Sequence, residues 1–189
     1  MIRISKLNIP VISVLSLCFL SLIEPTRYLL LILISVLCHE AGHYLAMKLF
    51  SVEISSVTLL PLGIDIKPAG QLIYYPKQAV ISALGPAINL ILFFCFYKSY
   101  SFFACINLLY ALFNLMPIRG LDGAQIIESI LNCILDTDTT EKILKTTSFI
   151  FCMILWLTGI YILFILNGNF SVFALSVFLY ASNFVIKSN

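Results

Sequence analysis

Two histidines and a glutamate lie within the five-residue motif His39-Glu40-Ala41-Gly42-His43, inside an apolar segment. Residues four positions apart share one face of a helix, about one turn apart, so both imidazoles can reach a single zinc ion. A glutamate beside such a histidine is the usual general base toward zinc-activated water. The chain contains no other histidine. The motif therefore predicts a zinc hydrolase centre with Glu40 as its acid/base.

The third zinc ligand must come from another part of the chain. A catalytic zinc ion commonly takes three protein ligands and keeps a fourth position for water. The candidate carboxylates are Glu24, Glu53, Asp65, Asp122, Glu128 and the polar cluster Asp136 to Glu141. Asp122 is favoured, because Pro117 ends the preceding helix and Gly120 and Gly123 allow a tight backbone path back. Without the histidine motif, Asp122 alone is more typical of a loop aspartate that accepts a turn or cap hydrogen bond.

The composition is that of a polytopic membrane protein. Hydrophobic residues make up 61% of the 189 residues and charged residues 11%, against roughly 25% charged residues in a typical soluble domain. Such a chain cannot cover itself with a polar surface, which excludes a soluble zinc hydrolase. Ionisable groups within the apolar run 28–50 are costly at membrane depth, so we expect them to be functional. A net charge of +2 without a basic run argues against nucleic-acid binding.

Apolar runs predict about six membrane-spanning helices, each near the ~20 residues that a bilayer requires. They cover about 8–23, 28–50, 77–97, 100–117, 146–166 and 170–186. Within the first 27 residues, the apolar stretch 9–23 is predicted to be a retained, rather short first membrane helix, because no small-x-small cleavage site follows it. Residues 125–135 are predicted to run along or into the membrane interface, and residues 136–145 to lie outside the membrane.

The segment 51–75 carries prolines, glycines and charged residues among alternating β-branched positions. This pattern predicts short strands in a β-hairpin or re-entrant segment after the second helix. Beside a metal site such a strand would offer an edge to an extended peptide, and a plain surface hairpin is the alternative. The predicted fold class is thus an all-α polytopic membrane protein with one short β segment, and residues 1–189 are predicted to form a single domain.

The distribution of basic residues predicts the orientation in the membrane. With six spans and a cytoplasmic N-terminus, nine lysines and arginines face the cytoplasm, and only Arg27 and Lys98 face outward. Both termini are therefore predicted to be cytoplasmic, with the site opening toward the cytoplasmic half. The six cysteines show no CxxC spacing, so a disulfide framework is not expected.

These motifs together resemble the site-2 protease family of intramembrane zinc metalloproteases. HExxH at His39 to His43 is followed by NxxPxxxLDG at Asn114 to Gly123, and Ala83 to Asn89 is similar to the family's Gly-Pro-x-x-Asn. Phe50-Ser51 and Thr58 to Gly63 resemble the compact sporulation branch, the stage IV sporulation protein FB type. That branch often carries a nucleotide-sensing CBS domain after the sixth helix, and neither this domain nor a PDZ-like insertion is expected within residues 1–189.

The resemblance implies His39, His43 and Asp122 as zinc ligands and Glu40 as the catalytic acid/base. It also implies regulated intramembrane proteolysis of a membrane-spanning or membrane-associated substrate in a bacterial cytoplasmic membrane. One substrate of this kind is a sporulation sigma-factor precursor, and an inhibitory or regulatory membrane protein is one expected partner.

Two asparagines are further candidates. Asn114 could hydrogen-bond the substrate backbone or the oxyanion, and Asn89 could do the same or brace the helix packing. Hydrogen bonding between helices is the alternative role for both. Gly85-Pro86 is expected to interrupt the third helix and either make room near the site or simply kink it.

Two other functions are consistent with intramembrane histidines and carboxylates. A metal transporter or metal-binding sensor would use them, although transport gives no reason for Glu40 to lie beside a ligand. A catalytically inactive homologue that binds membrane proteins would retain the fold, and the intact motif argues against it.

Overall fold

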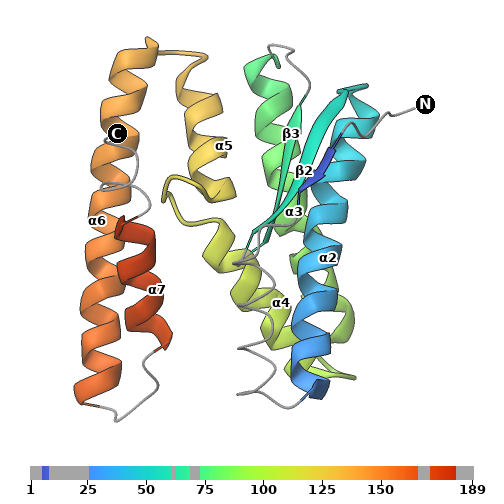
Figure 1. Ribbon diagram of the computed structural model, residues 1–189, viewed down its shortest axis with the longest axis vertical. Coiled ribbons are helices and arrows are strands. Elements are labelled where there is room, and N and C mark those ends of the chain that lie inside the picture. The colour runs from blue at the N-terminus through green and yellow to red at the C-terminus, as the bar shows by residue number, and fades with distance from the viewer. Residues whose placement is uncertain (1–5, 9–25, 61–62, 69–72, 166–170, 182–189) are drawn as a thin grey trace. The chain divides into compact units, whose positions relative to one another are not determined.

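The computed structural model describes residues 6–8, 26–60, 63–68, 73–165 and 171–181. The chain divides into two compact units, Met1–Asn114 and Leu115–Asn189, which are described separately. The first contains β1 (Lys6–Asn8), α2 (Thr26–Leu49), β2 (Ile54–Leu60), β3 (Gly63–Pro68), α3 (Tyr75–Phe96) and α4 (Ser101–Asn114), and the second contains α5 (Asp122–Leu131), α6 (Thr137–Phe164) and α7 (Ser171–Tyr180) (Figure 1).

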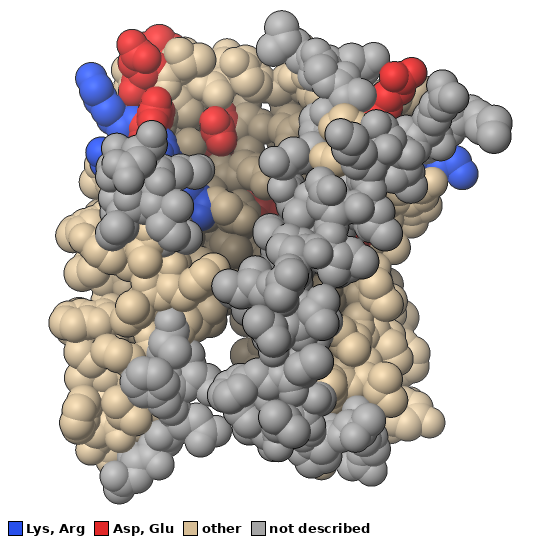
Figure 2. All heavy atoms as spheres, in the orientation of Figure 1, with Lys and Arg blue, Asp and Glu red and all other residues tan. Residues whose placement is uncertain are grey.

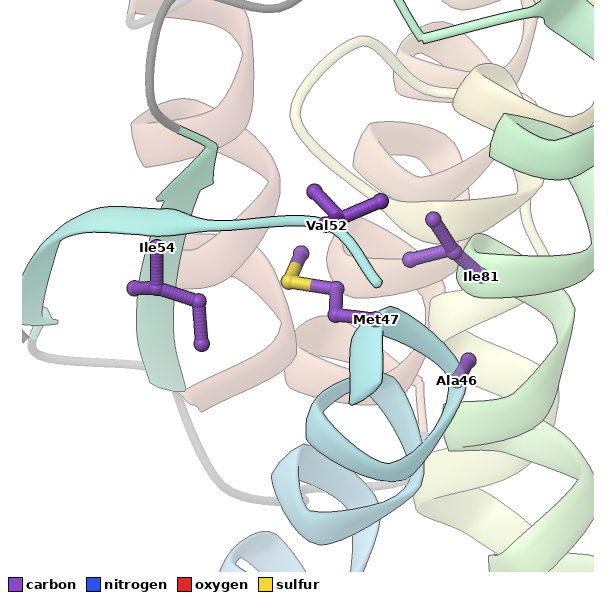
Figure 3. Packing of buried hydrophobic residues seen from close by; sticks show 5 residues of the cluster. All are labelled: Ala46, Met47, Val52, Ile54 and Ile81. Atoms are coloured by element: carbon purple, nitrogen blue, oxygen red, sulfur yellow. The ribbon is translucent and has the colours of Figure 1, made fainter. Parts of the chain in front are cut away.

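Helix α2 ends in a motif that turns the chain back onto the helix. Ser51 has a left-handed φ of 55°. Its N–H donates to the Lys48 carbonyl at 3.1 Å, and the Val52 N–H donates to the Met47 carbonyl at 2.9 Å. This Schellman pattern satisfies the last helical carbonyls and brings an apolar residue back against the final turn. The resulting buried cluster consists of Ala46, Met47, Val52, Ile54 and Ile81 (Figure 3).

Helices α2, α3 and α4 pack on one another in the first unit (Figure 1). At Gly42 the backbone of α2 lies against that of α3, because a Cβ there would stand 2.6 Å from the Leu84 carbonyl oxygen. Glycine alone permits so close an approach. Helix α3 continues through Pro86, so the expected interruption at Gly85-Pro86 is wrong. Proline removes one backbone donor from the helix, and packing against α2 and α4 holds the turns on either side.

The strands form one three-stranded sheet in the order β1-β2-β3. Strand β1 pairs parallel with β2, where Leu7 is opposite Val57. Strand β2 pairs antiparallel with β3, where Val57 is opposite Ile66. Strands β2 and β3 thus occupy the segment for which the sequence predicts strands, and β3 contacts α2. Strand β1 is not predicted by the sequence, because three residues beside an apolar run carry too little periodicity.

In the second unit, α6 has 28 residues and is roughly 42 Å long at 1.5 Å per residue. The carboxylate of Asp136 caps it by accepting a 2.8 Å hydrogen bond from the Thr139 N–H. Charged side chains gather at this end of α6, and the rest of its visible face is uncharged (Figure 2). The polar segment 136–145 is therefore the first part of the helix. Both α5 and α7 pack on α6.

Three described helical segments are long and apolar enough to cross a membrane: Tyr28–Leu49, Tyr75–Phe96 and Thr137–Phe164. The predicted span 100–117 contains only the 14-residue helix α4, about 21 Å long and shorter than the ~30 Å hydrocarbon layer. It ends at Asn114, ahead of Pro117, which disfavours helix at the residue before it. The predicted span 8–23 lies outside the described residues, and 170–186 is described only as far as residue 181, so six spans stay a prediction.

Candidate metal centre

The two histidines of α2 face one another in the first unit. Both side chains are buried, and their Nε2 atoms are 3.1 Å apart. The Nδ1 atom of His39 lies 2.6 Å from Oδ1 of Asn89 on α3. The Nδ1 atom of His43 lies 2.8 Å from the carbonyl oxygen of Ile81, also on α3. Each ring is therefore held by its own partner on the neighbouring helix.

These partners determine where the ring hydrogens lie. The carbonyl oxygen of Ile81 only accepts hydrogen bonds, so Nδ1 of His43 carries its hydrogen. Asn89 donates its Nδ2 group to the Ser35 carbonyl at 3.2 Å, which leaves Oδ1 to accept from Nδ1 of His39. In the neutral rings, both Nε2 atoms then present lone pairs across a gap of 3.1 Å. Facing lone pairs repel one another unless a cation lies between them.

The geometry of this pair fits a zinc ion. Two histidine nitrogens at 2.0–2.1 Å from a tetrahedral zinc are roughly 3.3 Å apart, close to the 3.1 Å separation of the Nε2 atoms. Zinc-binding histidines also commonly donate their second ring N–H to a carbonyl or carboxylate oxygen, and both rings here have such a partner.

Gly85 of α3 lies directly against both rings. A Cβ at this position would clash with Nε2 of His43 and would lie 2.8 Å from Nε2 of His39. A side chain here would therefore occupy the space beside the two nitrogens. The expectation that Gly85-Pro86 makes room near the site is met by the missing side chain of Gly85, since α3 is not interrupted. The ring of Tyr110 on α4 packs edge-on against His39, with centroids 4.9 Å apart.

Glu40 follows His39 on α2 and is buried, with 9% of its surface exposed. Successive helical residues point about 100° apart, whereas residues three apart share a face, so Glu40 points away from His39 but lies beside His43. This is the arrangement expected of a group that acts on a water molecule beside the metal and does not itself bind the metal.

Asp122 is the first residue of α5 in the second unit, and it is also buried. It is the one buried side chain among the described carboxylates that the sequence offers as third ligand. The others, Glu53, Glu128, Asp136, Asp138 and Glu141, are exposed. Glu24 and the Asp65 side chain lie outside the described part of the structure. A buried carboxylate requires a cation or hydrogen-bond donors, which favours Asp122 as a ligand.

The loop ahead of Asp122 is fixed to α6. The hydroxyl of Ser148 accepts a hydrogen bond from the Arg119 N–H at 3.0 Å and donates to the Pro117 carbonyl at 3.2 Å. The Arg119 guanidinium lies 3.2 Å from a carboxylate oxygen of Glu141. Gly120 has a φ of +96°, a conformation that favours glycine. These contacts hold the start of α5, and with it Asp122, in one position within this unit.

Sequence reasoning missed several residues that support the histidines. Ser35 and Ile81 contribute backbone carbonyls, which no side-chain pattern reveals. Asn107 of α4 is fully buried and accepts a hydrogen bond from Asn89. Its position inside the apolar run 100–117 is the one available signal, because an amide in hydrocarbon requires a partner. Asn114, at the end of α4, donates to the Tyr110 carbonyl at 3.0 Å.

Comparison with known proteins identifies the family. The chain matches peptidase family M50 over residues 27–103 and 95–157. The chain belongs to peptidase family M50. The match includes the histidine pair, Glu40 and Asp122, and it confirms the resemblance to site-2 proteases that the motifs indicate.

Relatives of this M50 chain include curated proteins and a solved structure. It is 31% identical to stage IV sporulation protein FB of Bacillus subtilis in an alignment of 170 residues that covers 84% of this chain and 58% of that protein. It is 28% identical to zinc metalloprotease MJ0392 of Methanocaldococcus jannaschii in an alignment of 118 residues that covers 54% of this chain and 34% of that protein. The structure of a site-2 protease from Methanocaldococcus jannaschii has a TM-score of 0.69 at 22% identity, covering 95% of this chain and 90% of that one.

The M50 chain therefore has the fold of a site-2 protease. Zinc, predicted as its cofactor, is confirmed by the family and by a relative named as a zinc metalloprotease. The chain spans 58% and 34% of the lengths of these two curated relatives.

Proposed function

We propose that this M50 chain is an intramembrane zinc metalloprotease that hydrolyses peptide bonds of membrane-spanning or membrane-associated proteins. The observation that carries the proposal is the buried histidine pair on α2, whose two Nε2 atoms lie 3.1 Å apart. This pair lies on an apolar helix long enough to cross a membrane. A histidine pair of this geometry fits a metal ion, and the neighbouring Glu40 supports a hydrolytic use of that metal.

In this proposal His39, His43 and Asp122 hold the zinc ion. The histidines supply two nitrogens, and the buried carboxylate of Asp122 supplies an oxygen of a type that zinc binds. The family match spans all three positions, and the exposure of the other described candidates supports the choice of Asp122. One coordination position is left for water, which is the pattern of a catalytic site.

Each of these residues has its own role in the proposed hydrolysis. When bound, zinc acidifies water toward a pKa of about 7 and polarises the scissile carbonyl. Glu40 removes the proton from the attacking water and later passes it to the leaving amine. The carbonyl of Ile81 and the amide of Asn89 keep the two rings oriented throughout. Asn114 is assigned to hydrogen bonding with the substrate backbone or the oxyanion, for which it has a second amide hydrogen beyond the one given to Tyr110.

The substrate must present an extended backbone to such a centre. A transmembrane helix has to unwind locally before a protease can cut it, so we expect substrates with helix-breaking residues near the cut. The relative in Bacillus subtilis is named for sporulation, and processing of a sporulation sigma-factor precursor, under control of an inhibitory membrane partner, is the specific role that we propose. The location is a bacterial cytoplasmic membrane.

The test compares wild type with Glu40→Gln on a panel of tagged single-span and membrane-associated substrates, with zinc content measured for both. Glutamine retains the shape of Glu40 but cannot take up a proton. We expect equal zinc content and a loss of cleavage of at least about 10²-fold, the lower range for removal of an acid/base group.

The other outcomes separate the alternatives. If both proteins bind zinc and neither cleaves any substrate, a transporter, sensor or inactive homologue is favoured. Wild type that lacks zinc after careful preparation would overturn the assignment of the site.

A further inference from the structure

We infer that Asn89 and Asn107 form a hydrogen-bond relay that fixes the tautomer and orientation of His39, so that both are positioning residues of the metal centre. The relay joins α4 to α3 and α3 to α2, all within the first unit. Its importance for zinc rests on the proposed function, whereas its effect on the ring of His39 can be measured without metal.

The direction of every hydrogen bond in the relay is determined at its far end. The Phe103 carbonyl can only accept, and it accepts from Nδ2 of Asn107 at 2.9 Å. Oδ1 of Asn107 is therefore the atom that accepts from Nδ2 of Asn89 at 2.7 Å. The Ser35 carbonyl accepts from the same Nδ2. Oδ1 of Asn89 then faces Nδ1 of His39 at 2.6 Å, which requires the ring hydrogen to lie on Nδ1.

Burial gives these hydrogen bonds their strength. Asn89 and Asn107 are both fully buried, so no water competes for their amide groups. An amide that turned over would set two acceptors, or two donors, against one another in a medium of low polarity. Asn107 therefore holds Asn89 in one orientation, and Asn89 holds His39. Removing Asn107 leaves Nδ2 of Asn89 with the Ser35 carbonyl as its acceptor, which loosens the amide without removing it.

The second histidine provides an internal control. Nδ1 of His43 donates to the backbone carbonyl of Ile81, a partner that substitution of either asparagine leaves in place. If the relay acts as inferred, a change at Asn89 or Asn107 affects one ring and spares the other. A general loosening of the helix packing would disturb both rings.

The experiment uses the full chain, metal-free, with ¹⁵N-labelled histidine, and records the ring nitrogens by NMR in detergent micelles. The chain has two histidines, so the spectrum contains two sets of ring signals. In wild type both rings should carry the hydrogen on Nδ1. A His39 ring that lacks a hydrogen on Nδ1 would overturn the inference before any variant is made.

Three variants complete the measurement. In Asn89→Leu, which is similar in volume, one histidine should become a mixture of tautomers and the other should not change. Asn107→Leu should shift the tautomer mixture of the same histidine to a smaller extent. If Asn89→Leu does not fold, the result for Asn107→Leu tests the relay by itself. Thr158→Val on α6 removes a comparable side-chain hydrogen bond to the helix backbone and should leave both rings unchanged. Unchanged rings in both asparagine variants, or equal changes in both rings, would overturn the relay.

Zinc affinity, measured by competition with a chromophoric chelator, tests the consequence for the metal. Asn89→Leu should weaken zinc binding about 10- to 100-fold, the usual effect of losing a partner of a ligating histidine. Because Asn107 acts through Asn89, the double variant should bind zinc no more weakly than Asn89→Leu alone. Additive losses would show that Asn107 acts on the site by another route. None of these measurements depends on proteolysis, so the relay and the proposed protease activity can fail separately.

Discussion

At the scale of single residues, the absence of a side chain at Gly85 is as important as the ligands. The space that a methyl group would fill lies beside Nε2 of both His39 and His43. An ion between these nitrogens needs that space, and at Gly42 the backbones of α2 and α3 already lie in close contact.

We therefore expect Gly85→Ala to lower zinc affinity by at least about 10-fold, the lower end for a disturbed ligand environment. The helix itself should tolerate the change, since alanine is the better helix former by about 1 kcal/mol. Metal analysis of the purified protein, together with its thermal unfolding, measures both effects. Ala87→Val, on the exposed face of the same helix, is the matched control and should bind zinc normally. Wild-type zinc content in Gly85→Ala would contradict this account of Gly85.

The meeting of His39 and His43 could be predicted from the sequence, because their spacing depends only on the helix that carries them. The role of Asp122 was harder to predict from the sequence, since it depends on where a loop and a new helix begin. The structure adds its burial, and ligation by Asp122 stays a prediction. The support from Asn107 and Ser35 could not be predicted, because it depends on which residues of neighbouring helices meet.

At the scale of elements, α6 begins with a cap whose strength depends on pH. The backbone N–H of Thr139 is the main cause that holds the pKa of the Asp136 carboxyl below its usual value. A carboxyl whose pKa is lower in the folded state stabilises the fold fully above its unfolded pKa of about 3.9. This contribution is lost as the pH falls through the lower folded value.

We expect the first turn of α6 to fray below about pH 4 in wild type, where the usual aspartate pKa lies. Asp136→Asn can cap the helix at any pH, so its first turn should keep the same protection across this range. Asp136→Ala should lose protection at neutral pH as well. Amide hydrogen exchange in the first turn of α6, followed from pH 7 to pH 3, measures all three proteins. An equal acid-induced loss in wild type and Asp136→Asn would assign the effect to other groups.

The elements themselves were only partly predictable. Long apolar runs predicted the bounds of α2 and α3 to within two residues, because the length of an apolar run in a membrane protein sets the length of its helix. The same signal overestimated α4, where Pro117 stops the helix, and it placed the start of α6 too late. There the polar residues 137–145 hid a helix that Asp136 begins. Strand β1 could not be predicted, because its three residues are too few to show an alternating pattern.

At the scale of the whole molecule, the charge distribution still predicts the orientation in the membrane. Nine basic residues against two favour cytoplasmic termini. In that arrangement, the turn around Ser99, between α3 and α4, faces outward.

A reporter experiment tests this orientation. Alkaline phosphatase inserted at Ser99 should be active, since it works only outside the cytoplasm, and green fluorescent protein fused after Asn189 should fluoresce. The exchanged pair, phosphatase after Asn189 and fluorescent protein at Ser99, should give little of either signal. The reverse pattern would contradict cytoplasmic termini and would turn the proposed site toward the outer half of the membrane.

The hydrogen bonds that join α2, α3 and α4 also limit how far these helices can move apart. Lipid tails offer no replacement partner, so pulling these helices apart would strand the amides of Asn89 and Asn107, at several kcal/mol for each unsatisfied group. We therefore expect the three helices to move as one block. If the proposed proteolysis is correct, the movement that admits a substrate takes place in other parts of the chain, and mutations that change its rate should lie outside this block.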